Sequence, residues 1–242
     1  MHLAETTWTD AERSADVALL PVGSTEQHGP HAPLGTDTLA AETVAGRGAD
    51  AYDGEAAVAP AIPVGVSEEH RHFAGTLWVS PDTFRAYVRE TVESLAHHGW
   101  DRVVLVNGHG GNVDALREVA ARLTRDGVAY TAPFTWFDAV ETDLEMGHAG
   151  PMETSLLFAT RPDLVREGRL EDAAAGGAAR WGEWEAGVNL AYDSAEFSGN
   201  GVVGDPRKAS EQQGAALLGA AGEGLAELMA VVSEREWEQK GE

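Results

Sequence analysis

Short apolar runs alternate with longer segments of mixed polarity along this chain. Four apolar runs, at 17–22, 57–66, 102–107 and 128–137, have the length and composition of buried strands. The segments between them carry apolar residues at helical spacing. Strands that alternate with helices predict an α/β fold, in which helices cover a parallel sheet on both faces. We find no internal repeat and treat residues 1–242 as a single domain.

Several helix boundaries can be read from capping residues. Ser80 suits an N-cap, Pro81 suits the first turn after it, and Gly99 suits the stop. The predicted helices are 38–52, 80–99, 112–127 and 208–236. The stretch 161–200 has no clear period, and we assign it no regular structure.

Each predicted strand is followed by a polar loop that carries histidine. In order, the loops are PVGSTEQHGPHAPLGTDT (21–38), VSEEHRHFAGT (66–76), NGHGGN (107–112) and MGHAGPMETS (146–155). Loops at the carboxyl ends of parallel strands meet at one edge of the sheet, where open α/β sheets bind ligands. We therefore expect these loops to form one site.

Four side chains in these loops are candidate metal ligands. Glu26 and His28 are two residues apart and point the same way in an extended segment. Asp37 follows them, and His109 lies among glycines that let the backbone approach a ligand. A set of imidazole and carboxylate ligands suits Zn, Mn or Fe. Alone, EQH would be structural more often than metal-binding, and NGHGG could equally be a tight turn with a helix-capping histidine, but their combination favours metal binding.

Other residues are candidates for contact with a substrate. Glu69 and His70 belong to the second loop, and we expect both to bind substrate. Trp136, Trp181 and Trp184 could wall a pocket or belong to the core; of these we select Trp136 as the substrate-binding candidate.

The charge balance limits the partners of the protein. With 17 basic and 40 acidic residues, the net charge is −23, so no basic face is expected to bind nucleic acid. Many carboxylates and only two lysines suit the cytoplasm of a salt-accumulating cell, although an ordinary acidic bacterial protein is the alternative. No apolar run of 18 residues or leader-like start appears, so we expect no membrane span or signal peptide.

Several other chemistries are excluded by sequence. The chain has no cysteine, so disulfides, thiolate ligands and cysteine nucleophiles are excluded. It contains no GxGxxG after the first strand, no GxxxxGK[ST] and no GxSxG, which removes the dinucleotide, P-loop and α/β-hydrolase interpretations.

Taken together, PVGSTEQHGPHAPLGTDT, NGHGGN, HAGPMETS and GVVGDPRKAS resemble the creatininase (creatinine amidohydrolase) family, in order and over nearly the whole chain. The resemblance implies a three-layer α/β/α domain with a mostly parallel sheet, assembled as a homo-oligomer, usually a hexamer. It also implies two divalent metal ions per chain, Zn, Mn or Fe. By motif position, Glu26, His28, Asp37 and His109 match ligands, Asp37 bridges both ions, and His148 matches a residue that handles the proton of the leaving group.

The activity implied by the resemblance is hydrolysis of an amide-type C–N bond in a small molecule by metal-activated water. Creatinine-like cyclic amides or formamides are the leading substrates. A formamidopyrimidine ribotide in flavin or deazaflavin synthesis and a short peptide in mycofactocin maturation are alternatives. From a different class, a non-catalytic protein that binds a metal or metabolite also stays open.

One position departs from the family pattern. Creatininases carry a glutamate two residues after the histidine of NGH, where this chain has Gly111. His28 and Asp37 alone would leave the second ion with too few protein ligands. Glu153, in the first turn of a helix that Pro151 can start, is our candidate for the third ligand. The alternative is that Glu153 only caps that helix.

Overall fold

The structure is a computed structural model that describes residues 1–12 and 15–237. Its main sheet has four parallel strands in the order β2-β1-β3-β4: Ala56–Val58, Val17–Val22, Arg102–Asn107 and Tyr130–Thr135. The central pair is in register from Ala18 opposite Val103 to Val22 opposite Asn107. The predicted parallel sheet is confirmed.

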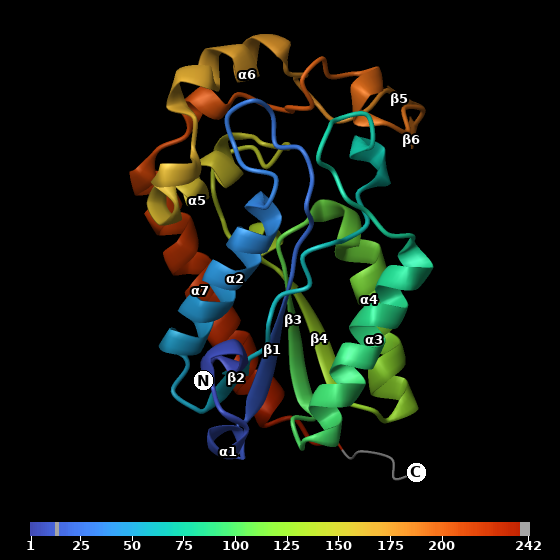
Figure 1. Cartoon of the computed structure of the whole chain (residues 1–242), viewed down its shortest axis with the longest axis vertical. Helices are drawn as coiled ribbons and strands as arrows, with labels where there is room; N and C mark the ends of the chain where they lie inside the picture. The colour runs from blue at the N-terminus through green and yellow to red at the C-terminus, as the bar shows by residue number, and fades with distance from the viewer. Residues whose placement is uncertain (13–14, 238–242) are drawn as a thin grey trace.

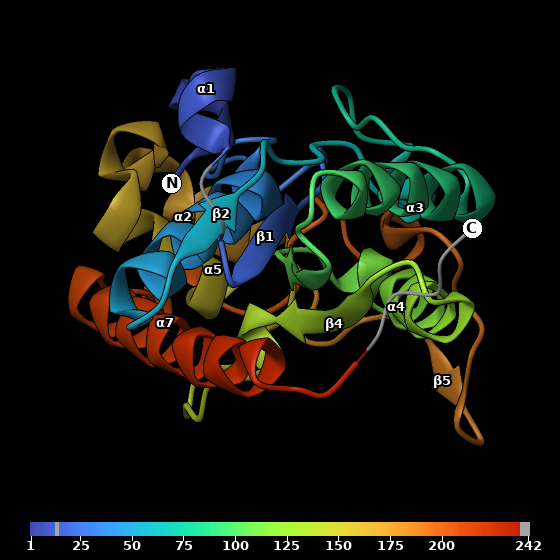
Figure 2. The ribbon, with the colours of Figure 1, turned by 90° about the horizontal axis from the view of Figure 1, so that it is seen from below.

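The sheet lies between two layers of helices (Figure 2). Because side chains alternate along a strand, Leu20 and Leu105 pack toward α3 (Pro81–His97) and α4 (Val113–Asp126). Leu19 and Val104 pack on the other face, with α2 (Thr36–Ala51), α5 (Pro151–Thr160) and α7 (Glu211–Ser233). This arrangement confirms the three-layer α/β/α fold.

The helix boundaries agree with the capping signals. Ser80 caps α3 by accepting a hydrogen bond from the Thr83 amide, and Gly127 ends α4 in the left-handed conformation. Asn112 precedes α4 but does not cap it with its side chain. Instead its amide donates to the Gly23 carbonyl and accepts from the Val66 amide, which ties three loops together. Short α1 (Trp8–Ala11) lies outside the predicted helices.

The second strand is shorter than predicted. Only Ala56–Val58 pairs as β2, although Ile62 still bridges to Val22. Pro60 and Pro63 lack the amide proton that a continued ladder needs, so the ladder stops at this edge of the sheet. The chain then continues without regular structure to the loop that carries Glu69.

The glycines of α7 are contact points between helices. A Cβ at Gly214 would lie 1.8 Å from the Ser155 carbonyl oxygen of α5, so only glycine permits this approach. Among the described residues, α7 is long and apolar enough to cross a membrane. Its buried face packs against α2 and α5, as the face of a core helix does.

Residues 161–200, for which the sequence predicted no regular structure, cross the carboxyl ends of the strands (Figure 1). They include α6 (Leu170–Gly176) and a two-stranded hairpin, β5 (Trp184–Glu185) and β6 (Val188–Asn189). Asp193 anchors this segment, because its carboxylate accepts from Arg71 at 2.8 Å. The segment therefore covers the edge of the sheet at which the polar loops meet.

Candidate functional site

Five candidate residues from four separate segments converge at the carboxyl edge of the sheet. Glu26 and His28 lie in the loop after β1, and His109 follows β3. Asp37 and Glu153 occupy the first turns of α2 and α5. Glu26, His28 and Asp37 are at most 1% exposed. Such burial of carboxylates is costly unless cations compensate their charge.

The hydrogen bonds of His28 determine which ring nitrogen faces the site. Its Nδ1 lies 3.2 Å from the backbone carbonyl of Glu26, an acceptor, so Nδ1 carries the proton. The other ring nitrogen, Nε2, is therefore the one available to a metal ion, and it faces Asp37 Oδ1 at 3.1 Å and Glu153 Oε1 at 3.6 Å.

His109 has the opposite tautomer for the same reason. Its Nε2 donates to the Val66 carbonyl at 2.7 Å, which leaves Nδ1 as the nitrogen available to a metal ion. Nδ1 faces Glu26 Oε1 at 3.3 Å and Asp37 Oδ2 at 3.2 Å. In both histidines, a backbone carbonyl thus orients the ring. Metal-ligating histidines are commonly oriented in this way, by a hydrogen bond from the ring nitrogen that does not bind the metal.

These contacts place carboxylate oxygens against ring nitrogens, which is unfavourable unless a proton or a metal ion lies between them. Both carboxylate oxygens of Glu26, His28 Nε2 and Asp37 Oδ2 are buried and have no hydrogen-bond partner among the described residues. The two Asp37 oxygens face different histidines, so this carboxylate is shared between two donor sets. The sets Glu26–Asp37–His109 and His28–Asp37–Glu153 fit two divalent ions with nitrogen and oxygen ligands.

The pKa values reflect the same excess of buried carboxylate. Burial raises the pKa of Glu26 to about 7, although His109 opposes the shift. Burial alone would lower the pKa of His28, but Asp37 and Glu153 outweigh it and raise that pKa well above its usual value. The metal-free site thus attracts protons to positions that ions would otherwise take.

His148 and His70 stack beside this cluster, with ring centroids 4.3 Å apart. His148 Nε2 donates to the Gln27 carbonyl at 2.7 Å, so its bare Nδ1 faces Glu26 Oε1 at 3.6 Å. Burial, and then the charge of His28, lower the pKa of His148 to about 4. His148 therefore presents a neutral proton acceptor to the site.

His70 presents a proton instead. The amide of Gln27 donates to the Gly201 carbonyl and to His70 Nδ1 at 2.9 Å, while Gln27 Oε1 accepts from Gly29. Because Nδ1 accepts, Nε2 carries the proton and points toward Glu26 Oε1 at 3.6 Å. Sequence reasoning missed Gln27, whose position between Glu26 and His28 was its one signal.

A cavity of about 330 Å³ opens beside the cluster. Both substrate-binding candidates of the second loop, Glu69 and His70, line it. Trp136 does not: it is fully buried in the core behind the site, and Phe137 and Trp181 line the cavity instead. Trp181 comes from the segment 161–200, where sequence periodicity gave no guidance.

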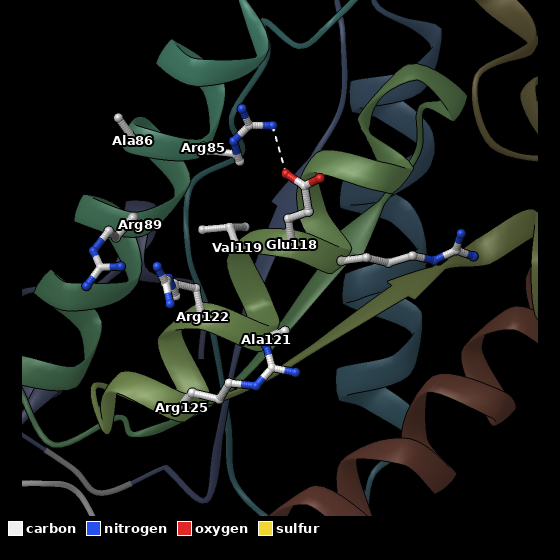
Figure 3. A pocket seen from close by; sticks show the side chains of 9 residues that line it. Arg85, Ala86, Arg89, Glu118, Val119, Ala121, Arg122 and Arg125 are labelled. Carbon is white, nitrogen blue, oxygen red and sulfur yellow. Dashed lines mark ion pairs between the residues drawn. The ribbon is translucent and has the colours of Figure 1, made fainter.

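A larger hollow of about 630 Å³ lies elsewhere, between α3 and α4 (Figure 3). Arginines of both helices line it, but Arg85 pairs with Glu118 at 3.0 Å and Arg89 with Asp126 at 3.2 Å. It shares no lining residue with the histidine cavity, and we assign it no chemistry.

Comparison with known proteins agrees with this geometry. The family model Creatininase, described as creatinine amidohydrolase, matches residues 4–229. The chain belongs to the creatininase family. A solved creatinine amidohydrolase (creatininase) superposes with a TM-score of 0.80 at 27% identity, covering 97% of this chain and 98% of the other. A creatininase structure titled as a Mn form superposes equally well, with 26% identity over 97% of this chain and 99% of the other.

Curated relatives in the family carry two kinds of name. The mycofactocin precursor peptide peptidase of Mycobacterium ulcerans is 38% identical over 81% of this chain and 77% of its own length. The creatinine amidohydrolase of Pseudomonas putida is 28% identical over 95% of this chain and 96% of its own length. The chain is therefore a hydrolase of the creatininase family, and its substrate is a separate question.

Two features of the site bear on the departure from the creatininase pattern. A Cβ at Gly111 would lie 2.2 Å from the Val66 carbonyl oxygen and 2.5 Å from His109 Nε2, so this backbone cannot carry a side chain. Glu153 Oε1 lies with His28 and His148 in a group of atoms able to hold a metal. Its other oxygen accepts from the Ala149 amide at 2.6 Å, so Glu153 binds the backbone at the start of α5 and faces the site at once.

Proposed function

We propose that this protein is a divalent-metal-dependent amidohydrolase that cleaves an amide-type C–N bond. The observation that carries the proposal is the shared carboxylate of Asp37, whose two oxygens face ring nitrogens of His28 and His109. Glu26 and Glu153 would complete the two ligand sets. Zn, Mn and Fe all suit these donors.

Two divalent ions held there would lower the pKa of a water molecule and polarise a substrate carbonyl. His148 has the tautomer and pKa to accept a proton at Nδ1 and later return it to the departing nitrogen. The Nε2–H of His70 is placed to donate a hydrogen bond toward the same region. Trp181 contacts both stacked histidines edge-on, with ring centroids 5.5 Å from His70 and 6.1 Å from His148.

A small cyclic amide or a formamide is the first substrate class that we propose. The second is a short peptide, which is favoured by the names and the 34–38% identity of the mycofactocin peptidase relatives. The open cavity wall at Gly110 and Gly111 is compatible with either. We further propose a homo-oligomer in the cytoplasm, on the basis of the resemblance and the acidic composition.

The proposal can be tested with protein stripped of metal by a chelator and reloaded with Zn or Mn. We expect about two ions per chain, and release of an amine from one substrate class in a panel of creatinine, formamides and short peptides. Stoichiometric metal without hydrolysis across the panel would instead support a non-catalytic binding protein. Protein that binds no metal would refute the proposed centre.

A further inference from the structure

The carboxylate of Glu69 lines the active-site cavity, yet neither the metal sets nor the acid–base residues use it. It forms no ion pair or side-chain hydrogen bond among the residues that the structure describes, and no lysine or arginine lines the cavity beside it. Burial raises the pKa of Glu69, with His109 opposing the shift. Apart from a hydrogen bond with its own backbone and the charge of nearby His109, the carboxylate has no partner among the described residues, so it can take one from a ligand.

Neighbouring residues hold the Glu69 carboxylate beside Gly111. Glu69 Oε1 lies 3.1 Å from the point that a Cβ on Gly111 would occupy. The hydroxyl of Ser194 donates to the backbone carbonyl of Glu69 at 3.0 Å. The missing side chain at Gly111 thus gives the Glu69 carboxylate access to the cavity.

Glu69 is separate from the candidate metal ligands. Among the described residues its carboxylate makes no close contact with a ring nitrogen of His28 or His109, whereas Glu26 faces His109 Nδ1 at 3.3 Å and Glu153 faces His28 Nε2 at 3.6 Å. Trp181 lines the same cavity and supplies an aromatic ring. A carboxylate and an indole together suit a positively charged nitrogen group, through ion pairing and cation–π attraction.

We propose that Glu69, with Trp181, forms a subsite that binds a positively charged nitrogen group of the substrate. This inference rests on the proposed function for the reacting end of the substrate. In this proposal Glu69 determines which substrates bind, and the metal-facing residues carry out the hydrolysis.

Binding of a simple cation tests the subsite without requiring turnover. Tetramethylammonium cannot coordinate a metal, and tert-butanol is a neutral molecule of similar size and shape. With zinc-loaded protein at constant ionic strength, ligand-observed NMR should show binding of tetramethylammonium and none of tert-butanol. Glu69→Gln should weaken tetramethylammonium binding about 10-fold.

Glu68→Gln is the matched control, because Glu68 lies on the same turn but is exposed and pairs with Arg71. This variant should bind tetramethylammonium as the native protein does. Equal binding by the native protein and Glu69→Gln would overturn the subsite. Loss of zinc in Glu69→Gln would also overturn it, because Glu69 would then be a metal ligand.

Kinetics separate the subsite from the proposed function. N-(2-aminoethyl)formamide carries an ammonium group where N-propylformamide carries a methyl group. If both are hydrolysed, the native enzyme should prefer the cation in kcat/KM about 10-fold, and Glu69→Gln should abolish that preference. Equal kcat/KM values for the two formamides would refute the subsite but not the proposed function. Absence of any amide hydrolysis would count against the proposed function, and the tetramethylammonium binding result would then decide the subsite.

Discussion

Replacing Glu153 by glutamine tests the second candidate metal site with little change in shape. In the native protein, Glu153 Oε2 accepts from the Ala149 amide and Oε1 faces His28 Nε2. A glutamine has one oxygen, which the Ala149 N–H will hold, because the amide NH₂ cannot accept a hydrogen bond. The NH₂ group then points at His28 Nε2 and donates to its lone pair. The substitution removes one charge and also blocks a second ligand.

The expected loss of affinity is large. Changes in residues that only orient metal ligands cost 10- to 100-fold, so loss of a direct ligand should cost about 100-fold or more, roughly 2.8 kcal/mol. The first set, Glu26, Asp37 and His109, keeps all its donors. We expect one ion per chain in Glu153→Gln under conditions where the native protein holds two, and most of the activity should be lost.

Equilibrium dialysis at graded free zinc, followed by elemental analysis, measures this directly. Circular dichroism should show a native fold, because the hydrogen bond to Ala149 is kept. Glu145→Gln is the control, since Glu145 is an exposed carboxylate of the preceding loop. Two ions per chain in Glu153→Gln at the same free zinc would refute the assignment and leave Glu153 as a helix-capping residue.

Four further predictions concern the same site and the charge of the chain. Asp37→Asn should abolish activity and reduce metal content while the fold persists, because an amide cannot offset the charge of two ions; normal metal content by elemental analysis would contradict the shared role. His148→Ala should keep the native metal content and lower turnover by roughly 10²- to 10⁴-fold, and loss of metal would make His148 a ligand. Because burial raises the pKa of Glu26 to about 7, zinc affinity of the stripped protein should fall as pH decreases below 7, where a proton occupies the carboxylate; a flat calorimetric profile from pH 8 to pH 6 would exclude this competition. Finally, the net charge of −23 should give a much higher thermal midpoint in about 3 M KCl than in low salt, and equal midpoints would refute the halophile prediction.

Much of the fold was predictable because it depends on local pattern. Apolar runs indicated the strands, and capping residues such as Ser80 and Gly127 indicated where helices begin and end. The order of strands and helices placed the polar loops at one edge of the sheet. The sequence could not show how far β2 extends, because Pro60 and Pro63 end the ladder only through the geometry of pairing.

The candidate site was likewise predictable in part from local sequence and in part only from the tertiary structure. By itself, the sequence determined the chemistry of the donors, since Glu26, His28, Asp37 and His109 occur in recognisable motifs after predicted strands. Only the tertiary structure decided which ring nitrogen of each histidine faces the site, because the backbone carbonyls that hold the other nitrogen come from the folded loops. It also decided that Trp181 rather than Trp136 lines the cavity, and that Glu69 lies beside Gly111. These relations join residues far apart in the chain, and periodicity and motif spacing report only on neighbours along it.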